Sequence, residues 1–396
     1  MRIPCKTIIG TAAEGSKYFQ RKRIESLILR ALRKGNFVHF TAPRRTGKTS
    51  ILKHLANENY DDLTCIYEDI ESDKTSSDLY RRLIKLIEKS INKSDNWGKK
   101  MWTTITSKKI KGISLHGKIE LESESIDYRQ LFLDLVNVIQ NSEIKIVLFL
   151  DEFPDVINNI RENEGSETAL NVLHTLRSLR QTSDFTQSFS LVFSGSVGLT
   201  HIVRKIGRAK LLNDLKVIEL EPLNVQEFDE FVSFITEGTS LYIPVETRNH
   251  IEVKLRQLIP YYIQLIIEKG DEWTEDNDST TLTIADVDHV YQKLITESDK
   301  FIDWVDRIKT YFSDHSKFLL HVLTTIAHRE ELVMQEVLNI ANQHNVEDFE
   351  ELIHQVLIAD GYLTKNESGK LIFASPLLRD WWKYHYRQIT HPKSFP

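Results

Sequence analysis

The sequence has few of the features that mark secreted, disulfide-bonded or membrane-spanning proteins. It contains only two cysteines, Cys5 and Cys65, which indicate neither a disulfide framework nor a zinc site and fit a reducing compartment. The longest run of apolar residues covers positions 146–150, far short of the roughly 18–20 residues of a membrane span. The first residues, MRIPCKTIIG, have no long apolar core and no small-residue cleavage site, so we expect a cytoplasmic protein.

An excess of positive charge is also lacking. The chain of 396 residues has 51 Lys+Arg against 57 Asp+Glu, a formal net charge of −6. This balance argues against a protein covered in nucleic-acid contacts, although a local basic patch is compatible with it. The hydrophobic fraction of 41% is typical of a folded protein and excludes disorder as the main state. At roughly 100–200 residues per domain, two or three domains are expected.

In the first half of the chain, β-rich runs alternate with segments of helical periodicity. Such alternation predicts a parallel sheet covered by helices on both faces. The expected strands cover residues 35–41, 63–70, 144–150 and 190–193, and the expected helices cover 49–57, 79–91, 128–140 and 170–179.

A polar stretch at about 94–124 interrupts this alternation and is interpreted as an insertion. Within it, residues 99–118 carry six lysines and no acid. We interpret this stretch as a solvated loop, with contact to nucleic acid or to an acidic partner as the alternative.

After residue 222 the pattern becomes helical. Helices are expected at 224–236, 246–258, 261–273 and 283–295, with a capping box formed by Thr283 and Asp286. The tail predicts three helices (316–328, 333–342 and 347–359), a hairpin at 362–373 and a helix from Pro376. That order is typical of a winged helix. We therefore predict an α/β domain at 1–221, a helical lid at 222–300 and a winged-helix domain at 301–396.

The strongest motif is APRRTGKT at residues 42–49, which follows an expected strand and precedes an expected helix. It matches the phosphate-binding loop G-x-x-x-x-G-K-[ST], with alanine in place of the first glycine. Lys48 can reach the β- and γ-phosphates, the Thr49 hydroxyl can ligate Mg²⁺, and Gly47 lets the backbone approach the phosphates. The motif predicts an ATP site formed by Pro43, Arg44, Arg45, Thr46, Gly47, Lys48, Thr49 and Ser50.

Two further strand ends complete the expected catalytic set. The apolar run at 146–150 ends in Asp151 and Glu152. Asp151 would hold Mg²⁺ together with Thr49, and Glu152 would orient or deprotonate the attacking water. After the strand at 190–193, Ser196 or Ser194 could lie beside the γ-phosphate, although an ordinary Gly/Ser turn is equally compatible with the pattern.

The chain resembles the archaeal-type STAND ATPases, which are AAA-related P-loop proteins that often carry a C-terminal winged helix. The resemblance rests on KYFQRKRIESL, APRRTGKTS, LFLDEF, FSGSVG, IGRA, LEPL and IPYY, which follow in this order. It implies that Tyr18, Phe19 and Arg21 lie near the adenine and that Pro260 covers the base. It also implies that Arg208 senses the phosphates, in its own chain or in a neighbour; a solvated basic turn is the alternative.

Together these features predict an α/β P-loop ATPase that uses Mg-ATP as a switch and couples nucleotide state to self-assembly or a protein partner. The first alternative is a DNA-binding ATPase of the origin-recognition or transposition-helper type. The second is a nucleotide-stabilised scaffold that barely hydrolyses ATP. The expected third tail helix at 347–359 contains four acids and no Lys or Arg. We therefore expect the tail to bind protein or to autoinhibit, and not to read DNA.

Overall fold

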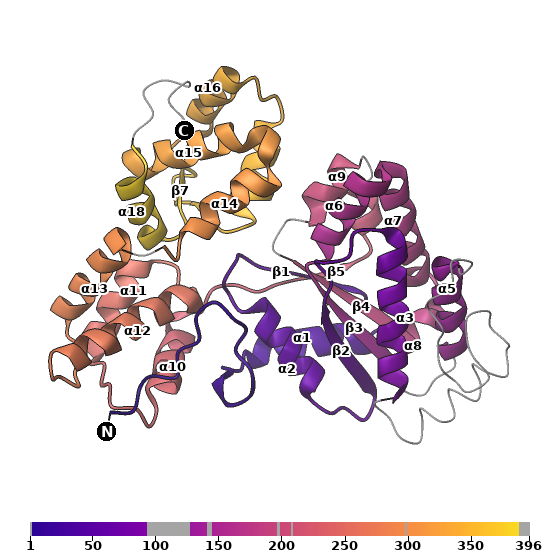
Figure 1. Cartoon of the computed structure of the whole chain (residues 1–396), viewed down its shortest axis with the longest axis horizontal. Helices are drawn as coiled ribbons and strands as arrows, with labels where there is room; N and C mark the ends of the chain where they lie inside the picture. The colour runs from indigo at the N-terminus through magenta and orange to yellow at the C-terminus, as the bar shows by residue number, and fades with distance from the viewer. Residues whose placement is uncertain are drawn as a thin grey trace. The chain divides into compact units, whose positions relative to one another are not determined.

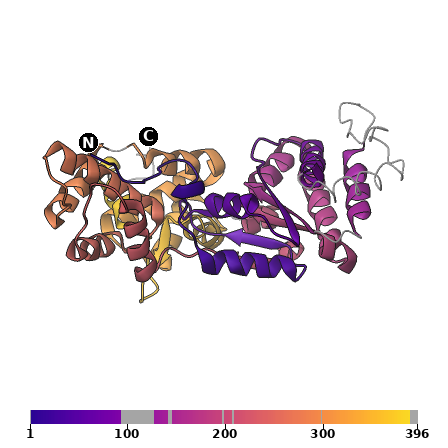
Figure 2. The same cartoon turned by 90° about the horizontal axis from the view of Figure 1, so that it is seen from below.

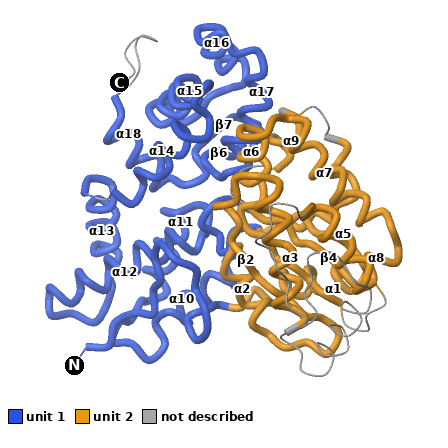
Figure 3. Tube along the Cα trace, turned by 45° about the vertical axis from the view of Figure 1, so that its right-hand side comes forward, with its two compact units in different colours: residues 1–19, 42–47, 221–396 blue, residues 20–41, 48–220 orange. Residues whose placement is uncertain are grey.

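The computed structural model describes residues 2–92, 127–140, 145–195, 199–206, 209–297 and 299–387. The predicted insertion at about 94–124 lies outside these residues. The chain divides into two compact units, coloured separately in Figure 3. The first unit comprises residues 1–19, 42–47 and 221–396, and the second comprises residues 20–41 and 48–220. No helix in the described ranges has the length and apolar character needed to cross a membrane.

The second unit is built on a five-stranded parallel sheet, which confirms the predicted α/β fold (Figure 1). The strand order is β2-β3-β4-β1-β5. Every residue of the interior strand β3 is buried, as expected for a parallel strand covered on both faces. The strands are β1 (Val38–Thr41), β2 (Leu63–Asp69), β3 (Lys145–Asp151), β4 (Phe189–Ser194) and β5 (Lys216–Glu219).

Helices lie against both faces of this sheet (Figures 1 and 2). The helical spacing predicted for residues 79–91 is confirmed, because its aliphatic side chains are buried: Leu79, Leu83, Ile84, Leu86, Ile87 and Ile91. The helices are α1 (Lys22–Arg33), α2 (Lys48–Asn57), α3 (Ser76–Asn92), α5 (Tyr128–Ile139), α6 (Phe153–Glu164), α7 (Ser166–Arg180), α8 (Ser183–Ser188) and α9 (Leu199–Lys205), followed by a 3₁₀ turn at Ala209–Leu212.

Beyond residue 221 the first unit is mostly helical, as predicted. The capping box at the start of α13 is confirmed: the Thr283 N–H donates to the Asp286 carboxylate at 2.9 Å, and the Asp286 N–H donates to Thr283 Oγ1 at 3.3 Å. These helices are α10 (Val225–Thr236), α11 (Val245–Leu255), α12 (Pro260–Asp276), α13 (Ile284–Glu297), α14 (Ile302–Tyr311), α15 (Ser316–Arg329) and α16 (Met334–His344).

The expected third tail helix differs from the prediction in its form. It begins with the short helix α17 (Phe349–Leu352) and continues as a π-helical segment at Ile353–Ile358. An antiparallel hairpin of β6 (Leu363–Lys365) and β7 (Leu371–Phe373) follows, and α18 (Pro376–His385) ends the described chain.

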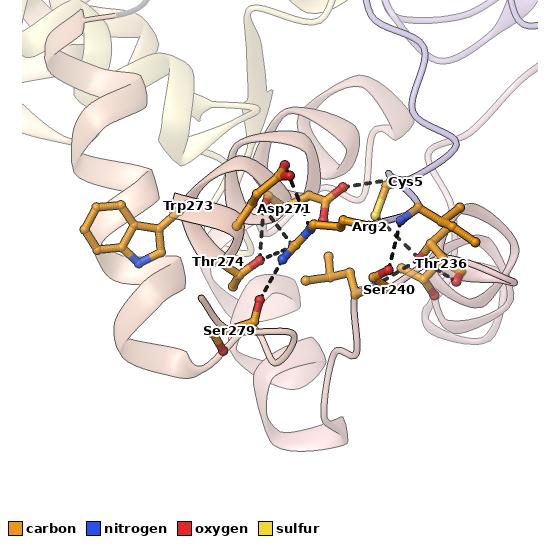
Figure 4. A network of polar contacts seen from close by, with 12 residues as sticks. Arg2, Cys5, Thr236, Ser240, Asp271, Trp273, Thr274 and Ser279 are labelled. Carbon is orange, nitrogen blue, oxygen red and sulfur yellow. Dashed lines mark hydrogen bonds and ion pairs between the residues drawn. The ribbon is translucent and has the colours of Figure 1, made fainter. Parts of the chain in front are cut away.

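The N-terminal segment is hydrogen-bonded to α12 and the loop that follows it, within the first unit (Figure 4). The Arg2 guanidinium donates to Asp271 Oδ1 and Thr274 Oγ1, both at 2.6 Å, and to the carbonyl oxygen of Ser279 at 2.6 Å. The Cys5 N–H donates to the other oxygen of Asp271 at 2.9 Å. Burial and the neighbouring Asp271 charge raise the pKa of the Cys5 thiol to about 12, so the sulfur stays protonated and poorly nucleophilic.

Candidate nucleotide site

The first contact of the site joins α2 to the end of β3. Thr49, in the first turn of α2, donates its hydroxyl hydrogen to Asp151 Oδ2 at 2.7 Å. Asp151 is the last residue of β3 and is 3% exposed. Strands β1 and β3 are not neighbours, because β4 lies between them. The two residues predicted to hold Mg²⁺ are thus in hydrogen-bond contact, although 102 positions separate them in the chain.

Asp151 is held by two further donors. The Tyr67 hydroxyl donates to Asp151 Oδ2 at 3.2 Å, and the Glu152 N–H donates to Oδ1 at 3.3 Å. Burial, followed by the negative charge of Asp151, raises the pKa of Tyr67, so the phenol keeps its proton and acts as a donor. No motif in the sequence indicated Tyr67.

Glu152 has a left-handed backbone, with φ of 56° and ψ of 31°, at the N-cap of α6. Its carboxylate faces the turn after β4: a Cβ atom built on Gly195 would lie 3.4 Å from Glu152 Oε2. The same Cβ would lie 2.4 Å from Cδ of the Pro154 ring. A larger residue at position 195 would therefore displace the start of α6, which carries Glu152.

The end of β4 supplies a serine beside these acids. Ser194 is 1% exposed, and its hydroxyl has no hydrogen-bond partner within the described residues. Its strand pairs with β3 on one side and with β1 on the other. Of the two serines considered as γ-phosphate contacts, Ser194 is the last residue of β4. Ser196 lies outside the described residues. Arg208 also lies outside them.

The segment Ala42–Gly47 of the phosphate loop belongs to the first unit. Gly47 has a φ of +100°, a conformation that favours glycine and explains its place in the motif. The Thr46 hydroxyl donates to the carbonyl oxygen of Pro43 at 2.7 Å, which closes the loop on itself. Lys48, 8% exposed, follows directly in the chain as the first residue of α2, and Ser50 lies in the same helix.

Within the first unit, the two loop arginines contact residues from the C-terminal part of the chain. Arg45 forms an ion pair with Asp303 (Nη2–Oδ2, 3.0 Å), and its guanidinium carbon lies 4.6 Å from the centroid of the Tyr261 ring. The Arg44 guanidinium lies 5.5 Å from the Trp304 ring, and the Arg44 N–H donates to the carbonyl oxygen of Asp360 at 3.2 Å. The motif predicted these arginines at the nucleotide but did not indicate these contacts.

The residues expected near the adenine are divided between the units. The Phe19 ring packs edge-on against Phe231 of α10, with centroids 5.2 Å apart. Tyr18 is 8% exposed and Pro260 opens α12, and both belong to the first unit together with Phe19. Arg21 belongs to the second unit, where its N–H donates to a carboxylate oxygen of Glu25 at 3.0 Å.

The donor set around Thr49 fits Mg²⁺. Because the Thr49 hydroxyl gives its hydrogen to Asp151, its oxygen lone pairs remain available to a hard cation. Mg²⁺ is usually bound through one or two protein oxygens, waters and substrate phosphates. Such a site does not require a cluster of protein ligands. In the described part of the chain, no group of three or more His, Cys, Asp or Glu side chains is placed so that it could hold a metal ion.

Comparisons with known proteins show what this part of the chain is similar to. Residues 31–203 match the family model of the AAA domain. A Walker-type ATPase of Pyrococcus abyssi has the same fold, with a TM-score of 0.62 and 14% identity over 95% of this chain and 99% of that one. The ORC2 protein of Aeropyrum pernix, solved in ADPNP–ADP complexes, aligns with a TM-score of 0.51 and 11% identity over 91% of each chain.

No curated protein sequence is similar enough to the chain to count as a match. Residues 31–203 are thus similar to the AAA domain, and the two structures share the fold of an α/β P-loop domain followed by a helical C-terminal region.

Proposed function

We propose that the protein binds and hydrolyses Mg-ATP and acts as a STAND-type molecular switch. The observation that carries this proposal is the hydrogen bond from Thr49 to Asp151, with Glu152 next in the chain. Lys48 and the N–H groups of the contiguous motif at residues 42–50 would hold the phosphates. Thr49 and Asp151 would hold Mg²⁺, which supplies charge neutralisation on the phosphate oxygens.

Glu152 would orient the attacking water and accept its proton. Its position at the N-cap of α6, facing Gly195, supports this role because Glu152 directly follows Asp151, which accepts the hydrogen bond of Thr49. Ser194, with a buried hydroxyl, would contact the γ-phosphate or the water; Ser196 and Arg208 remain candidates from the motif alone.

The switch part of the proposal rests on the contacts of the phosphate loop with the C-terminal part of the chain. Arg45 is held by Asp303 and Tyr261, and Arg44 by Trp304 and the backbone of Asp360. A phosphate group that attracts these guanidinium groups would weaken those contacts, so nucleotide would favour one arrangement of the C-terminal part over another. We propose a lid at 222–300 and a winged helix at 301–396 as the parts that respond.

Saturating Mg-ATP is expected to raise the melting temperature of the full chain. A ligand that binds only the folded state stabilises it by about 2.7 kcal/mol at 100 times its dissociation constant. The measurement is a thermal scan with and without Mg-ATP, with Mg-GTP as a comparison for base selectivity. An unchanged melting temperature at saturating ATP would refute nucleotide binding by the folded protein.

The second candidate function is a DNA-binding ATPase, which the structural similarity to the ORC2 protein brings into consideration as a fold-level analogy. The charges of the tail argue against it. The acids Glu350 and Glu351 lie in α17, and of the two hairpin lysines, Lys370 already pairs with Glu331. Of the two hairpin lysines, this leaves Lys365 to face a polyanion, against the acids of α17.

We expect the full chain to show no DNA binding that depends on this tail. The measurement is fluorescence anisotropy with a duplex of about 30 base pairs at about 150 mM salt, where purely electrostatic contacts are weakened. Micromolar binding that is lost in Lys365→Ala/Lys370→Ala would favour the DNA-binding candidate. Binding retained in that variant but lost when the lysines at 99–118 are replaced would assign DNA contact to the insertion.

A nucleotide-stabilised scaffold is the remaining alternative. It would give the same thermal shift but no release of phosphate. Steady-state turnover in the wild-type protein therefore separates it from the switch.

A further inference from the structure

The hydroxyl of Tyr67 on β2 contacts the carboxylate that is expected to organise the metal site. We propose that Tyr67 is a positioning residue that holds Asp151, and through it Thr49, in the arrangement needed for Mg²⁺-dependent nucleotide binding. This inference rests on the proposed function of the site. It assigns a role to a residue outside the phosphate loop and outside the acidic end of β3.

The register of the sheet explains how Tyr67 reaches Asp151. Strands β2 and β3 are parallel, with Tyr67 opposite Phe149 and Asp69 opposite Asp151. Side chains two residues apart on a strand point to the same face, so Tyr67 shares a face with Asp151 and lies one diagonal step behind it. A phenol is long enough to cover that step, and its oxygen lies 3.2 Å from Asp151 Oδ2.

Helix α2 covers the ring of Tyr67. Lys53 Nζ lies 5.6 Å from the ring centroid. Lys53 follows Thr49 by four residues in α2, so both side chains lie on one face of the helix. The face of α2 that presents Thr49 to Asp151 is therefore the face that also keeps the Tyr67 ring in place.

The arrangement has a consequence for the Thr49 hydroxyl. Asp151 Oδ2 accepts hydrogen bonds from both Thr49 and Tyr67, and Oδ1 accepts one from the Glu152 N–H. Three donors on two oxygens fix the plane of the carboxylate. A fixed carboxylate keeps the Thr49 hydrogen directed at Asp151 and the Thr49 lone pairs directed away, toward the position that a cation would occupy.

Tyr67→Phe removes the donor while keeping the ring against Lys53. A hydrogen bond to a charged group contributes about 1.5–3 kcal/mol. If the lower end of that range is lost from metal-dependent binding, the affinity falls about tenfold. We expect the dissociation constant of a non-hydrolysable ATP analogue to rise about tenfold in Mg²⁺, and to change less than about twofold in EDTA, where no metal has to be positioned. Calorimetric titration of the full chain under both conditions measures this difference.

Tyr60→Phe is the matched control. Tyr60 precedes β2 by three positions and is not among the donors to Asp151, which are Thr49, Tyr67 and the Glu152 N–H, so the same chemical change there is expected to leave both dissociation constants unaltered. A Tyr67→Phe protein that matches the wild type in Mg²⁺, or whose affinity falls by the same factor in Mg²⁺ and in EDTA, would overturn the positioning role. A wild-type protein whose affinity does not depend on Mg²⁺ would overturn the proposed function itself.

Discussion

Replacing Lys48 with alanine is expected to raise the dissociation constant for ATP by 100-fold or more. Lys48 opens α2 directly after the phosphate loop and is 8% exposed. The other cations of the loop, Arg44 and Arg45, are turned to Trp304 and Asp303 within the first unit. Two charge-assisted hydrogen bonds to phosphate, at about 1.5–3 kcal/mol each, account for a loss of this size.

Calorimetric titration with Mg-ATP provides the measurement. Lys34→Ala is a suitable control. Lys34 is exposed just after α1 and belongs to the second unit, as Lys48 does, and its removal changes the net charge by the same amount. An affinity within about threefold of the wild type in Lys48→Ala would show that the motif does not hold phosphates.

Glu152→Gln is expected to slow ATP hydrolysis by about 100-fold or more while leaving ATP affinity nearly unchanged. A general base contributes roughly 10²–10⁴-fold to rate, and glutamine keeps the size and polarity of the side chain but cannot take up the proton. The backbone of Glu152 is left-handed, with φ of 56°, and this conformation is as accessible to glutamine as to glutamate, so the fold is expected to survive.

Phosphate release under saturating ATP, together with the dissociation constant, separates the two effects. Glu162→Gln is the matched control, since Glu162 is exposed on the same helix α6. Hydrolysis at the wild-type rate in Glu152→Gln would show that another group activates the water. A parallel loss of affinity would indicate that Glu152 contributes to binding instead.

Some elements of the fold could be predicted because their signals are local. The strand β3 is a continuous apolar run that ends in Asp151, and helix α3 carries apolar residues at helical spacing. Strand β5 (Lys216–Glu219) was not predicted. It has four residues, only one of them buried, so neither alternation nor an apolar run marks it. Its place beside β1 comes from long-range pairing alone.

The candidate site shows the same division. The motif identified Lys48 and Thr49, because the chemistry of phosphate binding requires these residue types at fixed spacing. It could not show which side chains lie around Asp151. Tyr67 reaches that carboxylate through the register of β2 against β3, and register is a property of two strands that are distant in the sequence.

The phosphate loop, the acidic end of β3 and the change from an α/β to a helical pattern near residue 222 can all be predicted from the sequence. These depend on residues close together in the chain, where spacing and side-chain chemistry suffice. The strand order, the hydrogen bond from Tyr67 to Asp151, and the contacts of Arg44 and Arg45 with residues 303–360 depend on the three-dimensional packing of the chain. Those contacts join segments separated by tens to hundreds of residues, and packing alone selects them.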